Sequence, residues 1–245
     1  MKKFFAILGG LALTVSLLGC QQRAPDLPAI SRSFLAGYQD SQGTGRVLLN
    51  LLDDGTAAFY VGRLEDGTHT MTQYTAAYTL GENEEFDETI TINHQQGPTD
   101  GVILDGVFEL SGEETQHSLR FYETAPVSMD GDVYVGYLTK TSGMGPLVYA
   151  YGLCLREDAS FDVSIMQMAS VMHVWGSTGG TCIAKGNTAT FTYDIRTDQG
   201  ELIAPDALAE AVDFNGHSFS TGFNIQQNTM SASDARFIQV KETGE

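Results

Sequence analysis

Basic side chains are scarce in this chain of 245 residues. Only 13 lysines and arginines stand against 31 aspartates and glutamates, which gives a formal net charge of −18. Nucleic-acid binding depends on clustered lysine and arginine, and so does attraction to anionic lipid head groups. The composition therefore excludes nucleic acid as a partner and argues against peripheral binding to anionic membranes. An acidic surface instead favours solubility and cationic partners.

Catalytic signatures are also missing. The chain contains no Gly-x-Ser-x-Gly, no His-Glu-x-x-His and no phosphate-binding glycine loop. Its five histidines are scattered, and the acidic segment 82–88 lacks the spacing of a twelve-residue calcium loop. We therefore expect a non-enzymatic protein without a cofactor. A hydrolase stays open as an alternative, because catalytic triads follow geometry and not sequence order.

Apolar runs long enough to span a membrane are absent. Lys2 and Lys3 precede an apolar stretch from Phe4 to Leu18, which is shorter than the roughly 20 residues of a membrane-spanning helix. A charged start, a short apolar core and a small residue before the cleavage site are typical of a removable export signal. Residues 1–19 are therefore predicted to be a signal peptide.

The end of this stretch, Leu17-Leu18-Gly19-Cys20, resembles the lipobox of bacterial lipoproteins. The resemblance implies cleavage before Cys20, lipidation of its thiol and acylation of its freed amine, so that acyl chains hold the protein to a membrane. Gln21 at the next position implies export to the outer membrane of a two-membrane bacterium. Residues 20–30 would then form a lipidated tether, and the body would face the periplasm or the cell surface.

Cysteine is rare, and only Cys154 and Cys182 remain beyond Cys20. Two cysteines in an exported chain usually pair, because the compartment is oxidising. We therefore predict a Cys154–Cys182 disulfide, which would stabilise the fold by about 3–4 kcal/mol on the chain-entropy model. A catalytic or metal-binding thiol pair is the alternative, although no Cys-x-x-Cys motif favours it.

What the chain does have is a succession of short apolar segments bounded by turn residues, such as Arg46 to Leu52 before Asp53-Asp54-Gly55. Strands spaced by about 8–12 residues in this way indicate an all-β barrel or sandwich. We predict two tandem antiparallel meander barrels or sandwiches, in residues 31–124 and 132–245. The alanine-rich segment that follows Pro205 predicts one short helix near 205–211.

The two predicted domains form a degenerate internal repeat with a period of about 100 residues. Gly37-Tyr38 opens the first and Gly136-Tyr137 the second, while Arg120-Phe121 and Arg236-Phe237 close them. A glycine-aromatic opening strand and a closing strand with arginine loosely resemble the calycin or lipocalin-like barrels. The resemblance implies barrel architecture alone.

The segment from Phe161 to Gly176 predicts a hairpin that carries an unusual set of side chains. A turn at Ala169-Ser170 would pair Met166 with His173 and place both on one face, because side chains alternate along a strand. Met168 and Trp175 would share that face. Thioether and imidazole ligands suit copper(I) or silver(I), so a soft-metal carrier is one alternative function. A methionine-filled core is the other interpretation.

The leading hypothesis is a non-enzymatic envelope lipoprotein that binds a small apolar ligand or another envelope component. A large apolar cavity in the barrels would favour ligand carriage. Solid barrels would favour binding to a partner. The soft-metal carrier with Met166, Met168 and His173, the hydrolase and a purely structural role are the alternatives.

Overall fold

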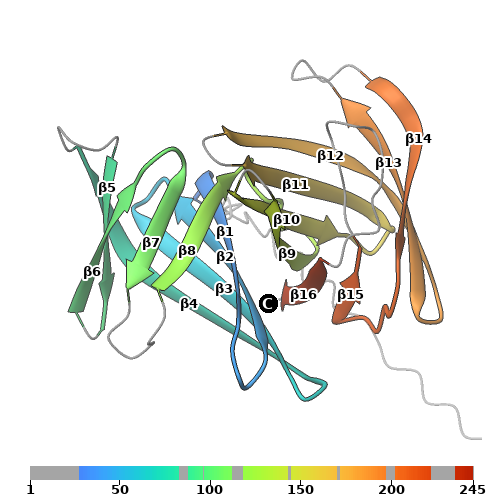
Figure 1. Cartoon of the computed structure of the whole chain (residues 1–245), viewed down its shortest axis with the longest axis horizontal. Helices are drawn as coiled ribbons and strands as arrows, with labels where there is room; N and C mark the ends of the chain where they lie inside the picture. Colours follow the sequence, from blue (N-terminus) through green and yellow to red (C-terminus); the bar gives the residue numbers. More distant parts are fainter. Residues whose placement is uncertain are drawn as a thin grey trace, which may run out of the picture.

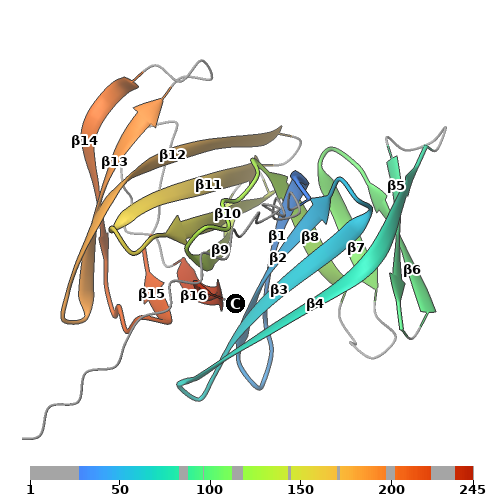
Figure 2. The same ribbon diagram turned by 180° about the vertical axis from the view of Figure 1, so that it is seen from behind.

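The computed structural model describes residues 28–82, 88–95, 97–111, 118–142, 145–169, 172–196, 202–221 and 235–244. Over these residues the chain is all-β, and its strands form two eight-stranded antiparallel sheets in tandem, as predicted (Figure 1). Each sheet curls into a nearly closed barrel, and the two barrels lie side by side (Figure 2). We call them the first and the second barrel.

The two barrels have the same strand order. The first is arranged β6-β5-β4-β3-β2-β1-β8-β7 and the second β14-β13-β12-β11-β10-β9-β16-β15, so each strand of the first has a counterpart eight places later. The first barrel contains β1 (Ile30–Gln39), β2 (Thr44–Leu52), β3 (Thr56–Glu65), β4 (Thr68–Gly81), β5 (Glu88–His94), β6 (Gly97–Ile103), β7 (Val107–Ser111) and β8 (Ser118–Thr124). The second contains β9 (Asp132–Ser142), β10 (Gly145–Leu155), β11 (Ser160–Ala169), β12 (Met172–Lys185), β13 (Thr188–Arg196), β14 (Leu202–Ala211), β15 (Ser218–Ser220) and β16 (Arg236–Lys241).

Tight turns join most of these strands, where the sequence supplies residues that tolerate positive φ. Asp66 and Gly67 have φ of 45° and 80° and connect β3 to β4, which is the two-residue turn that suits the twist of a hairpin. Asp105 and Gly106 repeat this geometry between β6 and β7. The Asp-Gly pairs of the sequence therefore fix where the strands reverse.

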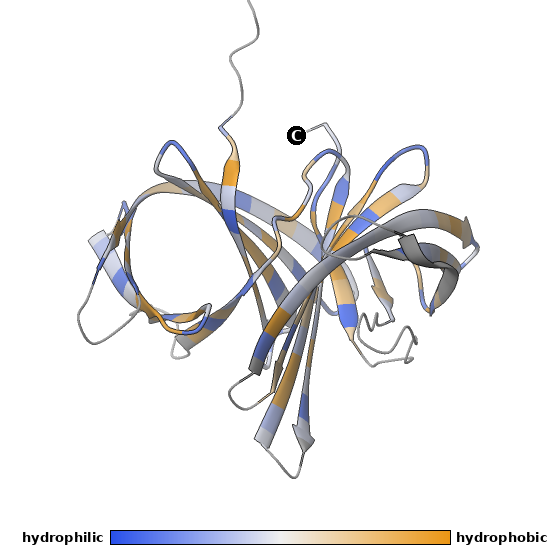
Figure 3. Ribbon diagram, turned by 90° about the horizontal axis from the view of Figure 1, so that it is seen from above, coloured by the Kyte–Doolittle hydropathy of each residue, from blue (hydrophilic) through white to orange (hydrophobic). Residues whose placement is uncertain are grey.

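Packed aromatic and aliphatic side chains line the interior of each barrel. The interior of the first barrel includes Phe34, Phe59, Phe108 and Phe121, all of them buried. Three tyrosines and four phenylalanines occupy the second: Tyr134, Tyr151, Tyr193, Phe161, Phe191, Phe219 and Phe237. Hydrophobic and hydrophilic bands intersperse along the strands, as alternation of side chains between the two faces requires (Figure 3).

One sequence prediction for the second barrel is wrong. The helix expected near residues 205–211 is the edge strand β14, which pairs with β13. Ala209 and Ala211 are buried in the barrel interior while Glu210 between them is exposed, so the segment alternates with a strand period. Tertiary packing thus overrides the helix propensity of alanine. The register shifts near Pro205, where an edge strand tolerates proline.

A third apolar cluster joins the outer faces of the two barrels. Leu35, Leu48 and Tyr122 from the first barrel pack against valines of β9, β10 and β16 and against Met166 of β11. Val127, in the segment between the barrels, is buried in the same cluster, and its amide donates to Ser33 Oγ at 3.1 Å. The barrels are therefore packed against each other and not merely tethered.

The internal repeat is confirmed strand by strand. Leu51 pairs with Ala57 in the first barrel and Leu155 with Phe161 in the second, so residues 104 positions apart are equivalent in β2–β4 and β10–β12. The connecting turns match as well. Asp54 Oδ1 accepts from Thr56 N at 2.9 Å, and its counterpart Asp158 accepts from Ser160 N at 2.9 Å.

The opening strands align one residue away from the sequence prediction. Gly37 pairs with Arg46, and Tyr137 pairs with Ala150, which is the counterpart of Arg46. Gly37 is therefore equivalent to Tyr137, and not to Gly136. The two equivalent residues also touch, because a Cβ on Gly37 would lie 2.5 Å from the Tyr137 ring.

A matched pair of histidines crosses the junction in opposite directions. His69 in β4 and His173 in β12 are equivalent, since they lie 104 positions apart. His69 Nε2 lies 2.8 Å from the carbonyl oxygen of Gln239 in β16, and His173 Nε2 lies 2.8 Å from that of Glu123 in β8. Equivalent residues that contact each other's counterparts are the mark of a two-fold interface. The two barrels of one chain are thus related by a pseudo-two-fold axis that passes near Gly37 and Tyr137.

Candidate functional site

The outer face of the second barrel carries the polar side chains of interest. Side chains on β11 and β12 alternate between the interior and this face. Asp162 lies opposite Gly179, Ser164 opposite Ser177, and Met166 opposite Trp175. Interior positions between them, such as Val163 and Ile165, belong to the aromatic core. The face therefore combines carboxylate, hydroxyl, glycine and indole groups in neighbouring rows.

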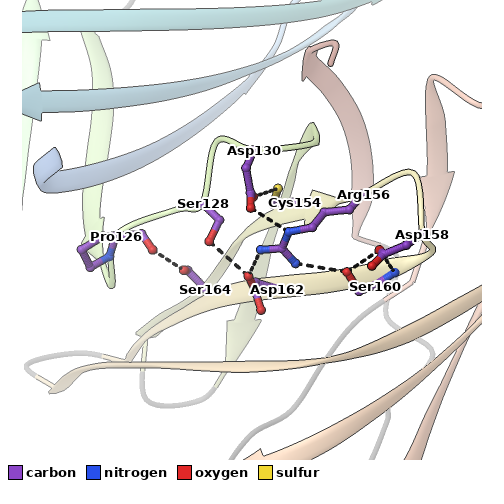
Figure 4. Close-up of polar contacts among 9 residues, drawn as sticks. All are labelled: Pro126, Ser128, Asp130, Cys154, Arg156, Asp158, Ser160, Asp162 and Ser164. Carbon is purple, nitrogen blue, oxygen red and sulfur yellow. Dashed lines mark hydrogen bonds and ion pairs between the residues drawn. The ribbon is translucent and has the colours of Figure 1, made fainter. Parts of the chain in front are cut away.

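The segment that links the barrels crosses this face and is fixed to it by hydrogen bonds (Figure 4). Ser164 Oγ donates to the carbonyl oxygen of Pro126 at 3.1 Å, and Ser128 Oγ donates to Asp162 Oδ2 at 3.2 Å. The linker approaches closely because Gly152 lies beneath it, and a Cβ there would lie 2.5 Å from a methyl carbon of Val127. The linker forms one wall of the site.

Arg156 organises the polar network at one end of the site. Its Nε donates to Asp130 Oδ2 at 2.9 Å, and its Nη2 forms an ion pair with Asp162 (Figure 4). The same hydrogen bonds raise the pKa of the guanidinium, and Arg156 holds the pKa of Asp130 below its usual range. Asp158 accepts from the Ser160 hydroxyl at 2.6 Å, which lowers the pKa of that carboxyl too. The linker and the strands are thus joined by charge-assisted bonds.

Between the linker and strand β12 lies a groove of about 1040 Å³. Its wall contains Pro126 and Ser128, and its ionic end contains Arg156. Strand β12 contributes the stretch from residue 174 to 181, which includes Gly176, Gly179 and Gly180. Of these glycines only Gly179 lies on the outer face, between Ser177 and Thr181, and a Cβ there would lie 2.8 Å from Asp162 Oδ1. We call this groove the β12 groove.

Trp175 is the single tryptophan of the chain, and its side chain lines the groove while remaining 51% exposed. Its ring centroid lies 4.8 Å from that of His173. His173 is itself anchored to the first barrel, because Nδ1 lies 2.8 Å from the carbonyl oxygen of Asp105 and Nε2 lies 2.8 Å from that of Glu123. The indole is therefore held against a fixed neighbour.

The side chains of the soft-metal hypothesis do share one face, but in a different register. Met168 pairs with His173 and Met166 with Trp175, two residues away from the predicted pairing, so the side chains keep the predicted face. Met166 is fully buried in the junction between the barrels. Both ring nitrogens of His173 contact backbone carbonyls, which leaves neither of them directed at a metal. Among the residues that the structure describes, no cluster of three His, Cys, Asp or Glu side chains can hold a metal ion.

The structure does not form the predicted disulfide, and Cys154 and Cys182 are free, buried thiols. Cys182 belongs to the interior core, whereas Cys154 follows the inward-facing Leu153 and donates from the outer face to Asp130 Oδ1 at 3.3 Å. The sheet wall separates the two sulfurs. Burial raises the pKa of Cys154 to about 12 and that of Cys182 to about 11, so both stay protonated at neutral pH.

The predicted lipidation site, Cys20, lies outside the described residues, as do the signal peptide and most of the tether. Within the part that the structure describes, no helix has the length and apolar character needed to cross a membrane.

Comparisons with known proteins identify no relative of this chain. No protein-family model matches the chain, and no curated protein or solved structure shows significant similarity to it. The site therefore has to be interpreted from its own geometry. Sequence reasoning selected Trp175 as part of the hairpin and placed a linker near residues 125–131, but it missed the roles of Asp130 and Arg156. No local signal marks these two residues, because they meet only in the folded chain.

Proposed function

We propose that this protein is a lipid-anchored lipoprotein of the bacterial cell envelope whose double barrel is a non-enzymatic binding module. In this account Cys20 carries the acyl chains, residues 20–30 tether the body, and the β12 groove binds another envelope component. Export to an outer membrane would follow from Gln21. The sequence of the first twenty residues supports the anchor.

One observation carries the binding role: a groove with a half-exposed indole lies on the outer face of a barrel, and in the described part of that barrel's interior aromatic rings pack against one another. Packed interior rings favour partner binding over carriage of a small apolar ligand. Tryptophan is enriched among the residues that anchor interfaces, where its ring is buried and its N–H finds a partner. The polar groups near it are bonded mainly to one another, which suits a rigid recognition surface better than proton transfer.

Site-specific photo-cross-linking in cells tests the groove. Ser177, in the groove, and its first-barrel counterpart Gln73, which is exposed on β4, are each replaced by p-benzoylphenylalanine in separate strains. We expect adducts from position 177 and none from position 73. Equal adducts from both positions, or none from position 177, would contradict a binding role for the groove.

The anchor needs a separate test. Cells fed an alkyne-tagged fatty acid should label the wild-type protein and the Cys154→Ala variant, but not the Cys20→Ala variant. Labelling that persists in the Cys20→Ala variant would contradict the lipoprotein assignment and would leave the proposal for the groove unaffected.

A further inference from the structure

We propose that the β12 groove binds carbohydrate, as a neutral or amino-substituted oligosaccharide with one sugar ring stacked on Trp175. The inference rests on the proposed function and assigns a ligand class to its groove.

Trp175 supplies a platform of the kind that a sugar ring needs. The face of an indole carries partial negative charge, and the C–H groups on one side of a pyranose ring carry partial positive charge, so the two attract when they stack. The ring of Trp175 is half exposed yet packed against His173, whose two nitrogens are held by carbonyls of the first barrel. A platform that is already ordered loses little side-chain entropy when a ligand binds.

The floor next to this platform carries hydroxyl groups. Ser177 and Thr181 contribute them on the outer face of β12, and Gly179 between them lets Asp162 of the neighbouring strand approach, because a Cβ there would lie 2.8 Å from Asp162 Oδ1. Hydroxyls both donate and accept hydrogen bonds, as sugar hydroxyls do. From Trp175 to Thr181 the strand runs about 20 Å, at roughly 3.3 Å per residue, which accommodates several sugar rings.

The charges around the groove decide against an anionic ligand. Arg156 is the only cationic side chain in the described lining, and it is paired with Asp130 and Asp162. Asp194 adds another carboxylate to the lining, and Asp158 lies beside Ser160. Phosphates and acidic polymers would therefore meet net negative charge, and the chain as a whole carries −18. A neutral or cationic polyhydroxylated ligand fits.

An added peptide strand would use a different part of β12 from the outer face. A peptide that extends a sheet needs an unpaired strand edge. Strand β12 is paired with β11 from Met172 to Thr181 but with β13 only from Gly179 to Lys185, so in the described part of the chain the stretch 172–178 has a partner on one side alone. A strand added at that edge would bond to backbone groups in the plane of the sheet, whereas the indole and the hydroxyls stand on the outer face, where a sugar ring would stack.

The single tryptophan makes the test direct. Selective excitation of indole in the full chain, purified in a detergent without a sugar head group, reports on Trp175 alone. The probes are tetra-N-acetylchitotetraose, cellotetraose, maltotetraose and, as anionic contrast, a heparin tetrasaccharide. We expect a blue shift and saturable binding with at least one of the three neutral probes, and none with heparin. Saturation by heparin alone would overturn the charge argument and the inference with it.

Substitutions of Trp175 separate the contribution of ring stacking from that of other contacts. Oligosaccharide binding to each variant is measured by calorimetry. Trp175→Ala should weaken binding at least tenfold, whereas Trp175→Phe should retain most of it because a ring is kept. Met71→Ala, at the equivalent position of the first barrel, is the matched control and should leave affinity unchanged. Circular dichroism shows whether each variant is folded. Affinity that persists in a folded Trp175→Ala protein would overturn the inference.

The cross-linking experiment keeps the two proposals apart. If position 177 captures a protein in cells and no neutral oligosaccharide binds, the carbohydrate inference fails while the groove stands as a binding site. If position 177 captures nothing and no oligosaccharide binds, both fail. A sugar-containing adduct from position 177 supports both.

Discussion

Strands β4 and β12 occupy the same place in the two barrels, and each has 14 residues, yet they present different chemistry. Where β12 has Trp175, Ser177 and Gly179, β4 has Met71, Gln73 and Thr75 at the equivalent positions. Asp162 and Arg156 likewise correspond to Ala58 and Leu52. The groove's side chains therefore have no chemical match at these equivalent positions of the first barrel, and they stand at positions that the shared architecture leaves unconstrained.

The conserved part of the comparison is the inside of the barrels and the junction between them. Phe121 and Phe237 are both buried in their barrel interiors, and His69 and His173 both reach a backbone carbonyl of the opposite barrel. Exact symmetry is broken where the axis passes, because a tyrosine on one side needs a glycine on the other. Packing thus preserves the fold in both halves, while the outer positions are free to differ.

Disrupting the contact between Gly37 and Tyr137 should have the largest effect on stability. Gly37→Ala places a Cβ 2.5 Å from the Tyr137 ring, and overpacking at a buried junction should lower the free energy of unfolding by about 2–4 kcal/mol. Urea unfolding followed by circular dichroism measures the loss. Adding Tyr137→Ala makes room and should restore part of the stability of the Gly37→Ala protein. A double variant no more stable than expected from additive losses would refute the contact.

The paired histidines should give smaller losses. Carbonyl oxygens only accept and a neutral imidazole has a single N–H, so His69→Ala and His173→Ala each remove one hydrogen bond across the junction, and we expect a loss of about 0.5–1.5 kcal/mol for each. The same unfolding assay compares them. No loss of stability at either position would show that the junction is not held as the hydrogen bonds imply.

The pH dependence of stability should differ between the two barrels, because only the second barrel contains cysteine thiols. A group whose folded pKa is raised contributes stability below its unfolded pKa, near 8.5 for cysteine, and loses it as pH rises towards the folded value. With folded pKa values of about 12 for Cys154 and about 11 for Cys182, wild type should lose more stability above pH 8.5 than a Cys154→Val, Cys182→Ala protein.

Thiol reactivity gives the matching control. At pH 8 Ellman's reagent should react with neither thiol in the folded protein and with both after denaturation without reductant. No reaction after denaturation would mean that a disulfide had formed.

The ion pair at the end of the groove should matter least for stability. Asp130 is largely exposed, so Arg156→Gln should cost about 0.2–1 kcal/mol. Because the folded pKa of Asp130 is depressed, its contribution is present above the unfolded pKa near 3.9 and disappears as pH falls below it. Wild type and Arg156→Gln should therefore converge in stability on acidification. A difference that persists at pH 2 would contradict this.

The sequence was sufficient for the fold class, the repeat and most turns, because alternation and Asp-Gly pairs are local signals. It failed at β14, where buried Ala209 and Ala211 obey a sheet period despite helix propensity. It failed for the pairing of Cys154 with Cys182. Counting strand reversals shows at which end of the barrel a residue lies, but not on which face of the sheet its side chain lies. The groove could not be predicted at all, since Asp130 and Asp162 meet Arg156 only after the linker folds over the second barrel.

Hydrogen–deuterium exchange of the full chain in isolated envelopes, compared with the purified protein, tests the central claim most directly. The account predicts slower exchange in envelopes for the linker 125–131 and the β12 stretch 176–181, with the equivalent β4 stretch 72–77 unchanged. Equal protection of both stretches, or protection confined to the first barrel, would contradict it.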